Sequence, residues 1–86
     1  MNKFFDGKVA IHCETEKQAQ LLLEILRNFN IRWLTGDEIC DITDWDTYRE
    51  KIGYALVNGD LGLGHIERLA TDYDVVKFDE VMKEEY

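Results

Sequence analysis

The segment covering residues 8–30 constrains the fold of this chain more than any other, because its hydrophobic pattern changes period once, at a capping residue. Val9, Ile11 and Cys13 alternate with their neighbours at a period of two. That period is typical of a strand with one buried face. Thr15 follows, and a three-and-four spacing of apolar residues replaces the alternation. The segment therefore predicts a strand that leads directly into a helix.

The helix that begins near Thr15 carries a broad apolar stripe. Gln18 lies three residues after Thr15, which is the spacing of a capping box, and glutamates in the first turn favour the positive end of the helix dipole. The stripe consists of Ala19, Leu22, Leu23, Leu26 and Phe29, with Leu21 and Ile25 beside it. A stripe of this width must be buried, so we expect the helix to pack on a sheet.

Shorter patterns predict the remaining elements. In chain order they are a strand at 31–34, an irregular segment at 37–50 with one or two helical turns after Thr43, strands at 53–57 and 60–64, a short helix at 65–73, a strand at 75–78 and a charged tail at 79–86. Asn58-Gly59 is a strong hairpin signal, because both residues tolerate positive φ. We predict one α+β domain over residues 1–86, with a mixed four- to five-stranded sheet packed on one long helix in the order β-α-β-(irregular)-β-β-α-β.

The charge balance narrows the classes of partner. Ten basic and eighteen acidic residues give a formal net charge of −8. This charge repels phosphate, and the arginines are scattered, so we expect no direct binding to nucleic acid. The acidity indicates either a surface adapted for solubility or one that is complementary to a basic partner. No apolar run approaches the ~20 residues of a membrane span, and the first residues lack a signal-peptide core, so we expect a cytoplasmic location.

Side chains that could bind a metal ion or act in catalysis are present, but not at the spacing that such sites require. His12, Cys13, Cys40 and His65 are the residue types of a zinc site, but adjacent strand residues point to opposite faces, and no Cys-x-x-Cys spacing exists. Cys13 is expected to be a buried free thiol, which is usually inert. We therefore expect no metal, no cofactor and no enzymatic activity.

Two further patterns resemble ligand loops only in part. Gly59, Gly62 and Gly64 suggest a phosphate-binding loop, but Asp60 would repel phosphate and the lysine of a P-loop is missing. The aspartates between residues 41 and 46 lack the register of a calcium loop. A hairpin and a solvated acidic loop explain both patterns without a ligand.

The irregular segment at 37–50 combines carboxylates with aromatic side chains. Its members are Asp37, Glu38, Asp41, Asp44, Trp45, Asp46, Tyr48 and Glu50. Aromatic residues in an acidic surround are either interface residues that face Arg and Lys or core anchors that hold a loop, and both interpretations stay open for Trp45. Because irregular segments carry function more often than regular ones, these eight residues are our predicted partner-binding site.

Positions spread over nearly the whole chain form a further pattern. They are Val9, His12-Cys13, Thr15, Ala19, Leu22-Leu23, Leu26, Trp33, Gly36, Trp45, Tyr54 and Tyr73-x-Val75-Val76-x-Phe78. This pattern resembles that of small uncharacterised accessory proteins of phages and prophages of low-GC Gram-positive bacteria. The resemblance implies a phage protein that binds a host protein, and it supplies no catalytic residues. Gly62, Gly64 and the strong acidity depart from the pattern.

The resemblance and the acidic segment together suggest a function. The chain would inhibit a host defence or nucleic-acid enzyme, as an anti-CRISPR protein does, by presenting carboxylates to a basic groove as a nucleic-acid mimic. One alternative is a module that sequesters a nucleotide signal with residues 59–65 and an arginine, across an oligomer such as a homodimer. The other is an enzyme that uses Cys13 or His65.

Overall fold

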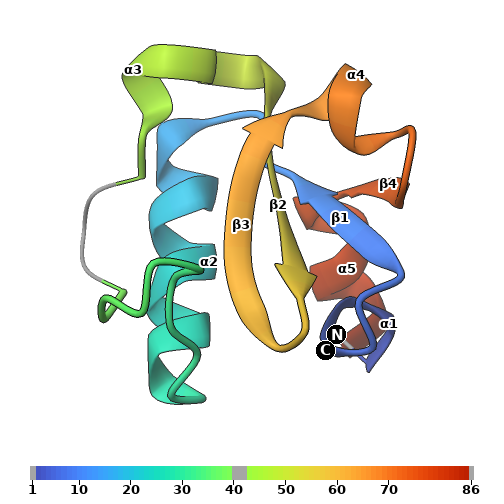
Figure 1. Ribbon diagram of the computed structural model, residues 1–86. Coiled ribbons are helices and arrows are strands. Elements are labelled where there is room, and N and C mark those ends of the chain that lie inside the picture. The colour runs from blue at the N-terminus through green and yellow to red at the C-terminus, as the bar shows by residue number, and fades with distance from the viewer. Residues whose placement is uncertain (1, 40–42, 86) are drawn as a thin grey trace.

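A four-stranded mixed sheet with helices on both faces forms this small α+β domain (Figure 1). The computed structural model describes residues 2–39 and 43–85. The elements, in chain order, are α1 (Asn2–Phe5), β1 (Val9–His12), α2 (Glu16–Asn28), α3 (Trp45–Tyr48), the 3-10 turn η1 (Arg49–Lys51), β2 (Ile52–Val57), β3 (Asp60–His65), α4 (Ile66–Leu69), β4 (Asp74–Lys77) and α5 (Phe78–Glu85).

The strands lie in the order β3-β2-β1-β4. The β2–β3 and β1–β2 pairs are antiparallel, and β1 and β4 are parallel. The predicted Asn58-Gly59 hairpin is confirmed, with positive φ values of 53° and 88° at its two turn residues. Ile11 is in register with Tyr54 on one side and Val76 on the other, so these three side chains share one face of the sheet. That face is the one that packs on α2.

The helix predicted after Thr15 is confirmed as α2. The Thr15 Oγ1 accepts a hydrogen bond from the Gln18 amide at 3.1 Å, and the Gln18 side chain accepts one from the Glu14 amide at 2.8 Å. The helix buries Ala19, Leu22, Leu23 and Leu26. Phe29 was predicted to extend the buried stripe, and this was wrong: it is the C-cap and is 60% exposed. The chain turns away at Asn30, whose φ is 61°.

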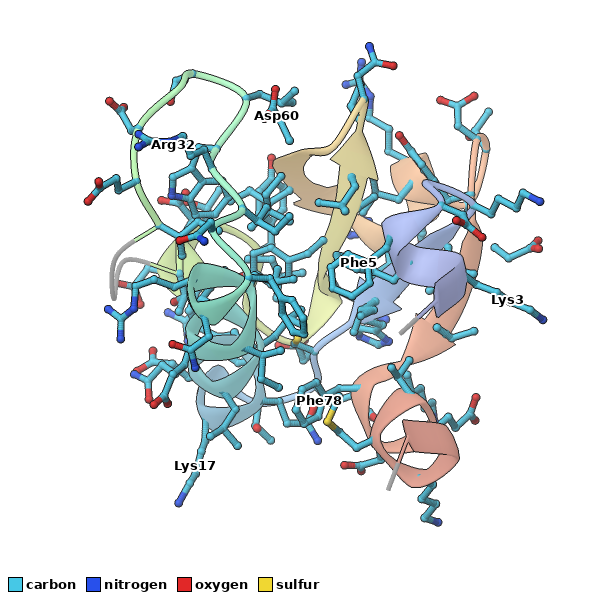
Figure 2. The ribbon with its side chains drawn as sticks, turned by 90° about the horizontal axis from the view of Figure 1, so that it is seen from below. Lys3, Phe5, Lys17, Arg32, Asp60 and Phe78 are labelled. Atoms are coloured by element: carbon cyan, nitrogen blue, oxygen red, sulfur yellow. The ribbon has the colours of Figure 1, made fainter. Side chains whose placement is uncertain are left out.

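The prediction of one long helix covering the sheet was also wrong, because α2 shares its layer with shorter helices. Phe4 of α1 and Phe78 and Val81 of α5 are buried in the same hydrophobic cluster as α2. Figure 2 shows Phe78 between α2 and α5, and Lys17 of α2 pointing away from the domain. On the opposite face α4 lies so close to β2 that a Cβ at Gly53 would come within 2.7 Å of the Leu69 side chain.

The predicted strand at 31–34 does not form, which changes the strand order. Among the described residues, this segment makes only two isolated bridges, Arg32 with Glu38 and Trp33 with Leu61. Asn30 and Gly36 both have positive φ, and the Gly36 amide donates to the Trp33 carbonyl oxygen, so turns bound this segment on both sides and leave it too short for a regular ladder. The last strand also ends one residue earlier than predicted, since Phe78 begins α5, an eight-residue helix where a charged tail was expected.

Candidate functional site

Thr43 fixes the start of the acidic segment that carries α3. Thr43 is 6% exposed, and its carbonyl oxygen accepts a hydrogen bond of 2.6 Å from the buried Tyr54 hydroxyl. Its own hydroxyl accepts a hydrogen bond from the Trp45 amide at 3.2 Å, so it satisfies a free amide at the start of the predicted short helix. One side chain from the middle of the sheet therefore positions the segment that follows.

The two aromatic residues of α3 hold the segment against the domain. Trp45 and Tyr48 are both half-buried and pack against the hydrophobic core. The Tyr48 ring also meets the His65 ring edge to face, with 6.4 Å between the centroids. Trp45 therefore anchors the segment to the core, which was one of its two interpretations. Its contact with a partner stays a prediction.

The residues on either side of α3 both have positive φ angles. Asp44 has φ 59° and ψ 26°, and Arg49 has φ 50° and ψ −129°. Residues other than glycine adopt such angles at a cost of about 1–3 kcal/mol each, and only where the surrounding structure imposes them. Tyr54, Trp45 and Tyr48 supply that constraint here. The strain turns the chain sharply and leaves the Asp44 and Asp46 side chains exposed.

Three of the predicted carboxylates converge around one pocket, which we call the acid-rimmed pocket. Its volume is about 410 Å³, and its lining consists of Trp33, Leu34, Thr35, Asp37, Glu38, Asp44, Leu61 and Gly62. The carboxylates come from two segments: Asp37 and Glu38 follow the turn at Gly36, and Asp44 precedes α3. Trp33, Leu34 and Leu61 form the apolar part of its lining, and the three carboxylates form the acidic part.

A second hollow lies beside the first and shares Asp44 with it. It has a volume of about 310 Å³ and is lined by Glu16, Gln20, Thr43, Asp44, Trp45, Asp46 and Thr47. Glu16 and Gln20 come from α2, outside the segment at 37–50 that was predicted as the partner-binding site. In the sequence Glu16 is explained by its place in the first turn of α2. Glu16 joins the acidic side chains of this hollow only because residues 43–47 pack near the start of α2 (Figure 1).

Glu50, another predicted site residue, is not part of this arrangement. Glu50 is exposed on η1 and lines neither hollow, while its carbonyl oxygen accepts a hydrogen bond from the His12 Nε2. Asp41 lies outside the residues that the structure describes, as does Cys40. The structure therefore brings together Asp37, Glu38, Asp44 and Asp46 and leaves Glu50 apart.

The candidates for catalysis have structural roles. Cys13 is fully buried, and burial raises the pKa of its thiol to about 12, so the nucleophilic thiolate does not form near neutral pH. The Nδ1 of His65 accepts a hydrogen bond from the Glu67 amide at 3.1 Å and caps α4. Within residues 2–39 and 43–85, no three His, Cys, Asp or Glu residues are grouped so that they could hold a metal ion.

The raised pKa of Cys13 predicts a stability change in mild alkali. The folded state holds the thiol proton more tightly than the unfolded chain, whose cysteine titrates near pH ~8.5, so stability is complete below that pH and falls as the pH rises toward about 12. Between pH 7 and pH 10 the free energy of unfolding should fall by about 2 kcal/mol through this group. Urea titrations of the wild type and of Cys13→Ala at several pH values give the free energy of unfolding of each as a function of pH. The wild type should lose about 2 kcal/mol more than the variant between pH 7 and pH 10, and an equal loss in both would contradict the prediction.

The glycine-rich stretch at 59–65 does not form a phosphate loop. Residues 60–65 are β3, and they pair with β2 along their whole length. The Leu61 amide donates to the Arg32 carbonyl oxygen at 2.8 Å on the other side of the strand. Gly62 has a packing reason, because a Cβ there would lie 3.0 Å from the Leu34 side chain. The absence of a side chain at Gly62 therefore leaves space for Leu34, and both residues line the acid-rimmed pocket.

Comparisons of the chain with protein-family profiles, with curated proteins and with solved structures find no significant match. No helix within the described part of the chain is long and apolar enough to cross a membrane. The site must therefore be interpreted from its own geometry and charge.

Proposed function

We propose that this chain is a non-enzymatic inhibitor that binds the basic nucleic-acid groove of a host protein, as phage proteins of the anti-CRISPR type do. The observation that carries the proposal is the convergence of Asp37, Glu38 and Asp44 around an apolar pocket, with Asp46 and Glu16 on the adjoining hollow. Carboxylates on a rigid frame can take the place of phosphates against Arg and Lys side chains, and the net charge of −8 speeds the encounter with a basic surface.

The frame around these carboxylates supports a binding role rather than a catalytic one. The hydrogen bond from Tyr54 to Thr43 and the packing of Trp45 and Tyr48 fix the backbone, so few groups need to be ordered when a partner binds. Cys13 and His65, on which an enzymatic interpretation depended, are occupied in the core and in the cap of α4. The proposed partner is a protein with a basic surface.

The proposal predicts that neutralising two carboxylates weakens partner binding by about tenfold and reduces its dependence on salt. Asp44→Asn and Asp46→Asn are suitable changes, because asparagine keeps the side-chain shape and tolerates the left-handed backbone at Asp44. Tagged wild type and double variant would be used to capture proteins from a Gram-positive host lysate, with elution in rising salt and identification by mass spectrometry.

The matched control combines Asp72→Asn with Asp74→Asn, which also removes two carboxylates, one from the turn between α4 and β4 and one from the first residue of β4. Asp72 is exposed, and Figure 1 shows that turn on the side of the domain opposite α3. We expect wild type and control to retain the same basic nucleic-acid enzyme up to the same salt concentration. Equal retention by the variant that carries Asp44→Asn and Asp46→Asn would contradict the proposal.

A further inference from the structure

We propose that the acid-rimmed pocket receives an arginine side chain from the partner protein, with the guanidinium held by Asp44 and Asp37 and the aliphatic stem on Trp33 and Leu34. This inference rests on the proposed function, since it names the group that the partner contributes to the same surface. It starts from the combination of an apolar wall with an acidic rim in one pocket of about 410 Å³. Arginine matches such a pocket because its stem is apolar and its head is a planar cation.

The apolar wall is exposed enough to take a ligand. Leu34 is 53% exposed, and Trp33 is half-buried with part of its surface on the core. Backbone hydrogen bonds fix both residues at the sheet edge, from the Leu34 amide to the Leu61 carbonyl oxygen at 3.0 Å and from the Trp33 amide to the Asp37 carbonyl oxygen at 3.0 Å. An indole beside a carboxylate offers a guanidinium both a stacking surface and a charged acceptor.

The three carboxylates of the pocket differ in the ion pairs and hydrogen bonds that they already make within the chain. Glu38 forms an ion pair of 3.6 Å with Arg32, whose guanidinium also donates to the Gly36 carbonyl oxygen at 3.2 Å. Asp37 accepts a hydrogen bond from the Thr35 hydroxyl at 3.0 Å, which orients one carboxylate oxygen. No cation within the described residues forms a salt bridge with Asp44. Asp44 is therefore the carboxylate with the most to gain from an incoming cation.

Arginine fits this site better than lysine does. A guanidinium can engage Asp44 and Asp37 with separate N–H groups while its plane lies on the Trp33 ring. A lysine ammonium is a compact, strongly hydrated charge that gains less from stacking. The pocket should accordingly select arginine over lysine, whereas a diffuse acidic surface would bind both equally.

The experiment titrates ¹⁵N-labelled protein at low salt with N-acetyl-arginine amide, N-acetyl-lysine amide and N-acetyl-citrulline amide, and follows the amide and indole resonances by NMR. Citrulline keeps the shape of arginine and lacks its charge. We expect arginine to shift the Trp33 indole and the Leu34, Asp37 and Asp44 amides, to bind about threefold or more tightly than lysine, and to exceed citrulline by a wider margin. Equal binding of arginine and lysine, or arginine shifts spread over the whole acidic surface, would overturn the inference.

Two variants locate the binding. Asp44→Asn should weaken arginine binding by about threefold or more, while Asp72→Asn, which changes the net charge equally, should leave it unchanged. Leu34→Ser removes part of the apolar wall at an exposed position and should reduce the preference for arginine over lysine. Unchanged selectivity in both site variants would also overturn the inference. If the pocket selects arginine but no host protein is released by salt, the proposed function fails while the pocket assignment stands. If a basic host protein is captured and released by salt but the pocket does not select arginine, the pocket assignment fails while the proposed function stands.

Discussion

Tyr54→Phe is expected to lower the free energy of unfolding by about 2 kcal/mol, although it removes a single oxygen atom. The Tyr54 hydroxyl is buried, and it donates to the Thr43 carbonyl oxygen at 2.6 Å. Burial raises the pKa of this hydroxyl well above its usual range, with smaller contributions from Cys13 and Asp44, so it remains a donor in alkali. Without it a buried carbonyl loses its partner, and the segment that carries Asp44 loses its anchor.

Tyr48→Phe is the matched control for this change. Tyr48 is half-buried on α3, and its ring contact with His65 does not require the hydroxyl. Urea titration should show a change within about 0.5 kcal/mol for the control. Hydrogen exchange at the Trp45 amide should accelerate in Tyr54→Phe, because that amide bonds to the Thr43 hydroxyl. Equal stability of the two variants would show that Tyr54 does not anchor the segment.

Leu22→Ala should have the largest effect on stability, a loss of about 2–5 kcal/mol. Leu22 is fully buried in the middle of α2, where it contributes to the cluster that joins the helix to the sheet. A domain of this size has a total stability of roughly 5–10 kcal/mol, so the variant should lose a large part of it and unfold at a clearly lower temperature than the wild type. Circular dichroism during thermal denaturation measures the effect.

Leu21→Ala provides the comparison, since the adjacent leucine is 42% exposed. It makes the same chemical change on the outer side of the same helix, and we expect it to lower stability by less than about 1 kcal/mol. The pair therefore tests which face of α2 meets the sheet. Similar losses for both leucines would contradict the packing described above.

Local signals in the sequence were sufficient for the elements whose partners are close in the chain. The alternation of Val9, Ile11 and Cys13, the cap at Thr15 and the Asn58-Gly59 turn predicted β1, α2 and the β2–β3 hairpin. Each signal depends on backbone preferences over a few residues, so it survives without knowledge of the tertiary fold. The α+β class and the mixed sheet follow from these elements.

The sequence was less informative where tertiary contacts override local pattern. Residues 31–34 have strand-like composition, yet the turns at Asn30 and Gly36 reduce them to two bridges. Phe78 continues the apolar run of β4, but the chain begins α5 there, and its ring is buried against the core. Neither outcome could be derived from periodicity, because both depend on where distant segments leave space.

The candidate site shows the same division between local and non-local information. The sequence identified the acidic segment as irregular and placed Trp45 and Tyr48 on one short helix, which the structure confirms for α3. It could not show that Asp37, Glu38 and Asp44 meet around one pocket, that Glu16 lies beside Asp46, or that Glu50 lies apart. Those relations depend on contacts between segments far apart in the chain, among them the hydrogen bond from the core residue Tyr54 to Thr43, next to Asp44.

Competition between this protein and nucleic acid for the captured partner shows whether the carboxylates act as a nucleic-acid mimic. The complex isolated from the host lysate would be exposed to increasing concentrations of a short DNA duplex and, separately, of single-stranded RNA, at constant ionic strength. If the carboxylates of Asp37, Asp44 and Asp46 occupy the groove that phosphates normally fill, one of these nucleic acids should release the partner in proportion to its affinity for it. A stable ternary complex of partner, nucleic acid and this protein would contradict the account.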